Sequence, residues 1–222
     1  MTTRRDPTEH KILGTIDKGI RNAQEKYEDE AWTALHQGPE YLITVSIFYA
    51  LSDLTKKDSL TLENRIDDLL GYLKGKPRRG RPHRVPRRRG RADICLWHKG
   101  EDRPRAIIEV KRCAKDWRKD TDIDRIAKLL RYSKFEFAIL ASCIHKVVED
   151  HNKNKLKRQI NDKLKDLRQY IEKKLDSQLS VKLVPSDFKT LLLKDKYPGG
   201  EGTDNWIWRP VVFKIYRKRN RQ

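Results

Sequence analysis

An almost continuous apolar run at residues 135–144 constrains the fold of this chain more than any other feature. Only Glu136 and Ser142 interrupt the run. A strand that alternates apolar and polar residues can leave one face in water, whereas a run that is apolar at nearly every position must be covered on both faces. We therefore expect residues 135–144 to form a buried strand in a sheet that carries helices on both sides.

The spacing of apolar residues elsewhere predicts the elements around that strand. Apolar residues recur every three or four positions in five segments, which predicts helices at 8–29, 39–54, 60–74, 122–132 and 146–178. Short β-rich segments predict strands at 92–97, 105–112, 180–184 and 206–216, the first two joined by a hairpin turn at 100–102. The expected fold class is α/β, with a mixed central sheet flanked by helices, in a single domain over residues 1–222 whose part 146–222 supplies a long helix and strands.

Two features of the C-terminal part bear on assembly. The predicted helix 146–178 has one apolar stripe, formed by Leu156, Ile160, Leu164, Leu167, Ile171 and Leu175. Such a stripe favours core packing, and a dimerising coil is the alternative. Trp206 and Trp208 share one face of a strand, which favours core or dimer packing over a platform for stacked bases. A homodimer is therefore one assembly that the sequence leaves open.

The net charge indicates that the binding partner is a polyanion. The 222 residues include 51 Lys and Arg against 32 Asp and Glu, a formal charge of +19. This excess favours nucleic acid first and an anionic membrane surface second. No run of 18 apolar residues and no secretory signal occurs, so we expect no transmembrane helix and no export. The three cysteines form no C-x-x-C pair, which is typical of reduced thiols in a cytoplasmic protein.

Much of the positive charge lies in the basic loop, which we define as residues 76–91. Nine Lys or Arg residues and no acid occur there, and the prolines and glycines among them exclude a helix. We expect this loop to contact nucleic-acid phosphates through Arg78, Arg79, Arg81, Arg84, Arg87, Arg88 and Arg89. Because the loop is not an amphipathic basic helix, we expect no membrane binding.

Acidic and basic side chains also occur inside the predicted hairpin. Glu109 and Lys111 project from the same face of an apolar strand, and Asp93 begins the preceding strand, where it can lie beside Glu109. Two buried carboxylates side by side require a compensating cation. Oxygen ligands alone suit a hard cation such as Mg²⁺ or Mn²⁺. The tripeptide pattern [DE]-x-K occurs four times, as often as chance predicts, but only Glu109-Val110-Lys111 lies inside a hydrophobic strand.

These residues resemble the PD-(D/E)XK nuclease superfamily, which includes restriction endonucleases, Holliday-junction resolvases and phage-defence effectors. The resemblance covers residues 38–145. It rests on a helix bearing Glu40, on Asp93, on Glu109-x-Lys111 sixteen positions further along, and on the helix and buried strand that follow. Ala92 stands where the family name expects proline. The resemblance implies a restriction-endonuclease-like core.

The resemblance also implies an activity and a role for each matching residue. The chain would be a Mg²⁺-dependent endonuclease that hydrolyses DNA phosphodiester bonds, with Mn²⁺ as a possible replacement. Asp93, Glu109 and the backbone carbonyl of Val110 would hold the metal. Lys111 would orient or activate the attacking water, and Glu40 would act in the outer shell or on a second metal.

Other interpretations of the same residues stay open. Helix 122–132 would face the site, and either Arg125 or Lys128 could contact the scissile phosphate. The acids and Lys111 could instead be an ion-pair network, or a degenerate nuclease core that binds nucleic acid without cutting it. A basic scaffold protein that oligomerises through helix 146–178 is a further alternative. His83 and His98 have no partner at ligand spacing, so we expect surface histidines.

Overall fold

The elements described here come from a computed structural model. It describes residues 6–31, 35, 38–55, 59–66, 69, 90–98, 103–118, 121–132, 134–147, 153–191 and 206–218. The helical elements are α1 (Glu9–Ala31), α2 (Glu40–Leu54), the 3-10 helix η3 (Ala114–Arg118), α4 (Asp122–Tyr132) and α5 (Lys153–Lys174). The strands are β1 (Leu60–Arg65), β2 (Arg91–Trp97), β3 (Pro104–Val110), β4 (Phe137–Val147), β5 (Leu179–Leu183), β6 (Lys189–Leu191) and β7 (Trp206–Arg217).

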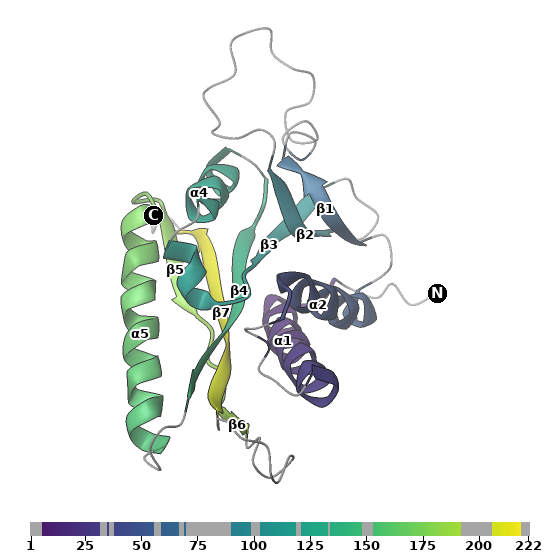
Figure 1. The fold of residues 1–222 in the computed structure, drawn as a ribbon. Coiled ribbons are helices and arrows are strands. Elements are labelled where there is room, and N and C mark those ends of the chain that lie inside the picture. Colours follow the sequence, from purple (N-terminus) through teal and green to yellow (C-terminus); the bar gives the residue numbers. More distant parts are fainter. Residues whose placement is uncertain are drawn as a thin grey trace, which may run out of the picture.

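A seven-stranded mixed sheet forms the centre of the molecule (Figure 1). Its strands follow the order β1-β2-β3-β4-β7-β5, and β6 pairs with β7 beside this path. Strands β3 and β4 are parallel, and every other pairing is antiparallel. A parallel pair needs a crossover connection, and here η3 and α4 supply it. The mixed α/β class expected from the sequence is confirmed.

Strand β4 has the two-sided burial that its sequence predicts. Residues 137–144 are all buried. Ala138 and Leu140 belong to the hydrophobic cluster on one face of the sheet, whereas Phe137 and Ile139 belong to the cluster on the other. Neighbouring residues thus enter different cores, as the alternation of side chains along a strand requires.

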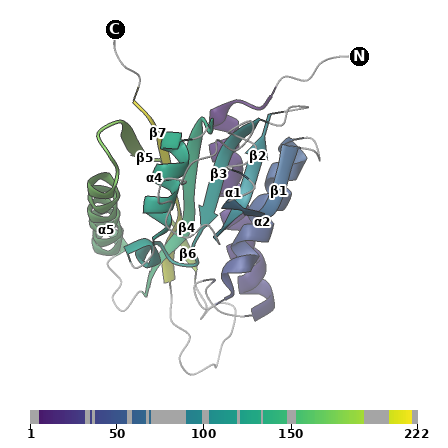
Figure 2. The same cartoon turned by 90° about the horizontal axis from the view of Figure 1, so that it is seen from above.

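Helices cover both faces of the sheet (Figures 1 and 2). Helices α1 and α2 lie on one side, and α4 and α5 lie on the other. The stripe of α5 is buried through Leu156, Ile160, Leu164, Leu167 and Ile171. Core packing of that stripe is confirmed. No helix in the described part of the chain is long and apolar enough to cross a membrane.

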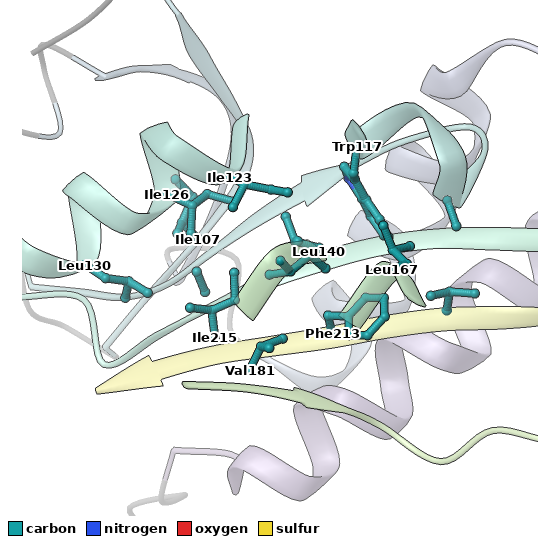
Figure 3. Close-up of a cluster of buried hydrophobic side chains, with 14 of the residues drawn as sticks. Ile107, Trp117, Ile123, Ile126, Leu130, Leu140, Leu167, Val181, Phe213 and Ile215 are labelled. Carbon is teal, nitrogen blue, oxygen red and sulfur yellow. The ribbon is translucent and has the colours of Figure 1, made fainter. Parts of the chain in front are cut away.

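Helix α4 is seated on the sheet by its apolar face. Figure 3 shows Ile123 and Ile126 of α4 beside Ile107 of β3, with Leu130 further along the same helix. These contacts fix the rotation of α4 about its axis. The rotation in turn decides which polar residues of α4 reach the end of β3.

Two expected elements differ from the structure, and one observed strand was not expected. Residues 60–65 form strand β1 instead of a helix, because Leu62 and its neighbours pair antiparallel with β2. The long helix begins at Lys153 and ends at Lys174, since residues 145–147 extend β4 and pair with β7. Strand β6 was not predicted. The basic loop up to residue 89, the remainder of the predicted helix after 69, and the turn 100–102 lie outside the described residues.

Candidate functional site

Charged side chains gather where β3 ends, between α2 and α4. Glu109 is the last charged residue of β3, and its side chain is only 1% exposed. It faces α4, where Arg125 places Nη2 2.6 Å from Glu109 Oε1. The strand position explains the burial, because Glu109 follows Ile107 on the face that α4 covers. The predicted orientation of Glu109 toward the helix that follows is therefore observed.

Asp93 reaches the same place from the neighbouring strand β2. Its Oδ2 accepts a hydrogen bond of 2.6 Å from the backbone N–H of Val110. Burial raises the pKa of Asp93 from 3.8 to about 6, against the opposing effects of that hydrogen bond and of the Lys111 ammonium. The negative charge of Glu40 raises the pKa further. Asp93 is therefore a carboxyl group that gives up its proton near pH 6 and not near pH 4.

Glu109 is perturbed in the same direction. Burial raises its pKa well above the ordinary value, and the negative charge of Asp93 adds to the effect. The Arg125 guanidinium opposes both. Two adjacent carboxyl groups with raised pKa values are the expected result of placing like charges in a poorly solvated position. Such a pair is stabilised in its ionised form by additional positive charge.

Lys111 and Glu40 complete the predicted group. The Lys111 Nζ atom lies 2.7 Å from Asp122 Oδ2 and 3.8 Å from Glu40 Oε1. Glu40 is the first residue of α2, and its Oε2 accepts a 3.0 Å hydrogen bond from the backbone N–H of Arg112. The backbone N–H of Lys111 donates to the carbonyl of Ala141, which extends the pairing of β3 with β4 and fixes the lysine at the strand end.

Asp122 is the member of this group that sequence reasoning missed. It is buried at the first turn of α4, where Arg125 Nη2 lies 2.6 Å from its Oδ1. An acid in the first turn of a helix has an ordinary explanation in the helix dipole, so the sequence gives little reason to select it. Its spacing of three residues from Arg125 was the available signal, because such residues share a helix face.

The group as a whole is acidic in a strongly basic chain. Its four carboxyl groups are those of Glu40, Asp93, Glu109 and Asp122, and its two cations are Lys111 and Arg125. With every group ionised the formal charge is −2, against +19 for the chain. We call these six residues the β3-end cluster. A local charge of this sign and size favours a cation, whereas the rest of the chain favours anions.

The residues expected to bind nucleic acid do not lie together in the structure as far as it describes them. Arg125 belongs to the β3-end cluster. Lys128 lies elsewhere on α4, at a surface pocket of about 250 Å³ that Arg131 and Asp176 also line. The seven arginines of the basic loop lie outside the described residues. His98 is not a surface histidine, because it is buried with its two ring nitrogens 2.9 Å from carboxylate oxygens of Asp6 and Glu136.

The metal donors in this region are few. Within the described residues, no group of three or more His, Cys, Asp or Glu side chains is arranged to hold a metal ion. The donors that the sequence proposed are two carboxylates, Asp93 and Glu109, with the backbone carbonyl of Val110. One oxygen of each carboxylate is already in contact with another group. Asp93 Oδ2 accepts a hydrogen bond from the backbone N–H of Val110, and Glu109 Oε1 contacts the Arg125 guanidinium. Oxygen donors of this kind fit a hard divalent cation that keeps several of its waters.

Comparison with known proteins adds no family to this description. No family model, no curated protein and no solved structure matches the chain. The chemistry of the β3-end cluster therefore rests on its own geometry and charge.

Proposed function

We propose that this chain is a Mg²⁺-dependent endonuclease that hydrolyses DNA phosphodiester bonds, with Mn²⁺ able to replace Mg²⁺. The observation that carries the proposal is the buried carboxyl group of Glu109 next to the partly buried carboxyl group of Asp93, both with raised pKa values, beside Lys111. With every group ionised, the cluster has a formal charge of −2, which one divalent cation would compensate. The positive charge of the chain would attract the phosphates of DNA, and the acidic cluster would bind the metal ion. A metal-dependent phosphodiesterase needs both.

Each residue of the cluster has a task that follows from its position. Asp93, Glu109 and the Val110 carbonyl would hold the ion, which when bound supplies an acidified water and neutralises charge on the phosphate. The Lys111 ammonium, held between Asp122 and Glu40, is a donor that can orient a water or a phosphate oxygen. Glu40 positions Lys111 and the Arg112 backbone from the opposite helix layer.

The arrangement of elements is consistent with the resemblance seen in the sequence. Helix α2, the hairpin of β2 and β3, helix α4 and the parallel strand β4 follow one another in the order on which the resemblance rests. This order supports a restriction-endonuclease-like core as part of the proposal. The basic loop ends where β2 begins, two residues before Asp93, so bound DNA would be held close to the carboxylates.

A plasmid cleavage assay with Mg²⁺ or Mn²⁺ tests the proposed activity. Wild type should cut, and Asp93→Ala or Lys111→Ala should each lower the rate by about 100-fold or more, since each removes a metal ligand or a donor to the reacting groups. Glu172→Ala and Lys174→Ala are matched controls, because they belong to a second acid-x-lysine tripeptide, at the end of α5. Cleavage that needs no metal, or that survives both site substitutions, would overturn the proposal.

A non-catalytic nucleic-acid-binding module is the second candidate. The Arg125 guanidinium already compensates the charge of Glu109 without a metal, which favours this alternative. It predicts DNA binding by wild type with no cleavage under any divalent metal, and the same affinity for Asp93→Ala. The scaffold alternative has lost its main support, because the apolar stripe of α5 is used inside the core.

A further inference from the structure

Arg125 occupies an unusual position for a residue expected to touch DNA. One atom, Nη2, lies 2.6 Å from Glu109 Oε1 and 2.6 Å from Asp122 Oδ1. The three side chains are 16%, 1% and 4% exposed, so the contacts are shielded from water. A guanidinium between two buried carboxylates is a counter-ion that favours their ionised forms. In the structure, Arg125 therefore supplies positive charge where the proposed function requires a metal.

The two cations cannot hold Glu109 in the same way at the same time. Arg125 contacts the carboxylate through Oε1, and an ion held by Asp93 and Glu109 would lie next to the guanidinium. Like charges at such a separation repel strongly when water is excluded. Either the ion binds weakly beside Arg125, or the guanidinium moves away as the ion binds.

Building on the proposed function, we propose that Arg125 is a resident counter-ion of the metal site, which a divalent cation displaces from Glu109. Once displaced, the guanidinium keeps Asp122 as a partner, because the two residues are three positions apart on α4. Its outer nitrogens then become available to the phosphate being cut. Arg125 thus links metal binding to substrate binding.

Gly90 connects this exchange to the basic loop. A Cβ atom at Gly90 would lie 3.1 Å from Arg125 Nη1 and 3.5 Å from its Cδ, so the backbone there packs directly on the arginine. The Gly90 carbonyl accepts a 3.0 Å hydrogen bond from the backbone N–H of Ile66, which anchors this point of the chain. Residue 90, where the basic loop meets β2, is therefore packed against the side chain that the proposed exchange would move.

Calorimetric titration of the whole chain with Mn²⁺ or Mg²⁺, without DNA, tests the exchange. Arg125→Met keeps the bulk of the side chain and removes the competing charge, so it should bind either ion at least 10-fold more tightly than wild type. Arg125→Lys should give an intermediate affinity. Arg131→Met is the matched control on the same helix, where Arg131 pairs with Asp176 at 3.4 Å, and its metal affinity should equal that of wild type.

Thermal melting provides a readout that does not depend on affinity alone. Without metal, Arg125→Met should melt below wild type, because Glu109 and Asp122 lose their counter-ion; Mn²⁺ should raise its melting temperature by more than it raises that of wild type. If Arg125→Met does not fold without metal, Arg125→Lys and refolding with Mn²⁺ present give the same comparison.

The outcomes separate the two proposals. Equal or weaker metal binding by Arg125→Met than by wild type overturns the exchange and leaves the proposed nuclease untouched. Absence of metal binding by both proteins overturns the proposed function and the exchange with it. Tighter metal binding by Arg125→Met, combined with slower plasmid cleavage, supports the exchange and the transfer of Arg125 to the phosphate.

Discussion

At the scale of single residues, the β3-end cluster is held together by contacts that the sequence predicts only in part. Asp93, Glu109, Lys111 and Glu40 meet in one place, as expected from strand alternation and from the resemblance. The choice between Arg125 and Lys128 could not be made, because it depends on the rotation of α4, which Ile123 and Ile126 fix by packing on β3. Such packing is a tertiary property that no local spacing reveals.

Asp93 leads to a prediction about stability and pH. Its pKa is about 6 in the folded chain and near 3.8 in the unfolded chain, so the folded state holds the proton more strongly between these values. The free energy of unfolding of the metal-free protein should therefore fall as pH rises from about 4 to 6. Above pH 6 the cost stays constant, at roughly 3 kcal/mol at most.

The substitution Asp93→Asn should remove that cost because an amide does not ionise. The amide oxygen can still accept the hydrogen bond from the Val110 N–H. Urea unfolding with EDTA at pH 4 to 8 measures the effect. The variant should be more stable than wild type at pH 7.5, and the difference should shrink as pH approaches 4. A difference that is the same at every pH would show that Asp93 is not the titrating group.

At the scale of elements, the helices and strands with one clear apolar period were predicted well. Helix α4 matches its predicted bounds of 122–132, and β7 matches 206–216 to within one residue. The helix prediction was wrong over 60–65 because Leu62 fits a helical period with Ile66 and Leu69 but also alternates with Leu60 as in a strand, and pairing with β2 decided between the two. The extension of β4 to Val147 likewise depends on its partner β7.

The packing of α1 on α2 gives a prediction at this scale. A Cβ atom at Gly19 would lie 2.7 Å from the Ile47 Cα, so Gly19→Ala must push the two helices apart, at a cost of roughly 1–3 kcal/mol. Because α2 begins at Glu40, the shift should also weaken the contacts of Glu40 with Arg112 and Lys111 and slow plasmid cleavage.

Gly14→Ala is the matched control on the same helix, since a Cβ atom there meets nothing within 4 Å. It should stabilise the protein by up to about 1 kcal/mol through the higher helix propensity of alanine. Thermal and urea unfolding of the two variants check both signs. A neutral result for Gly19→Ala would mean that α1 and α2 lie further apart in solution.

At the scale of the whole molecule, charge is divided between a basic chain and an acidic centre. The excess of +19 predicts binding to DNA that weakens steeply with salt. Replacing Arg87, Arg88 and Arg89 together by Gln should lower the slope of log affinity against log salt by about 3, since each phosphate that these arginines neutralise adds roughly 0.9 to it. Fluorescence anisotropy at about 50–300 mM salt measures this slope.

A triple substitution of exposed lysines on α5, Lys163, Lys165 and Lys173 to Gln, is the control with the same change of net charge. Its slope should stay close to that of wild type. Equal slopes for wild type and both triple variants would mean that the basic loop does not contact the phosphates and that the overall charge alone attracts DNA.

The position of β7 in the sheet has a consequence for folding during translation. Strand β4 pairs with β3 on one side and with β7 on the other, and residues 148–205 separate β4 from β7 along the chain. During translation every residue of the β3-end cluster leaves the ribosome before β7 does. A nascent chain at that stage exposes the apolar edge of its central strand, so it is most vulnerable to aggregation when the whole β3-end cluster has already been synthesised.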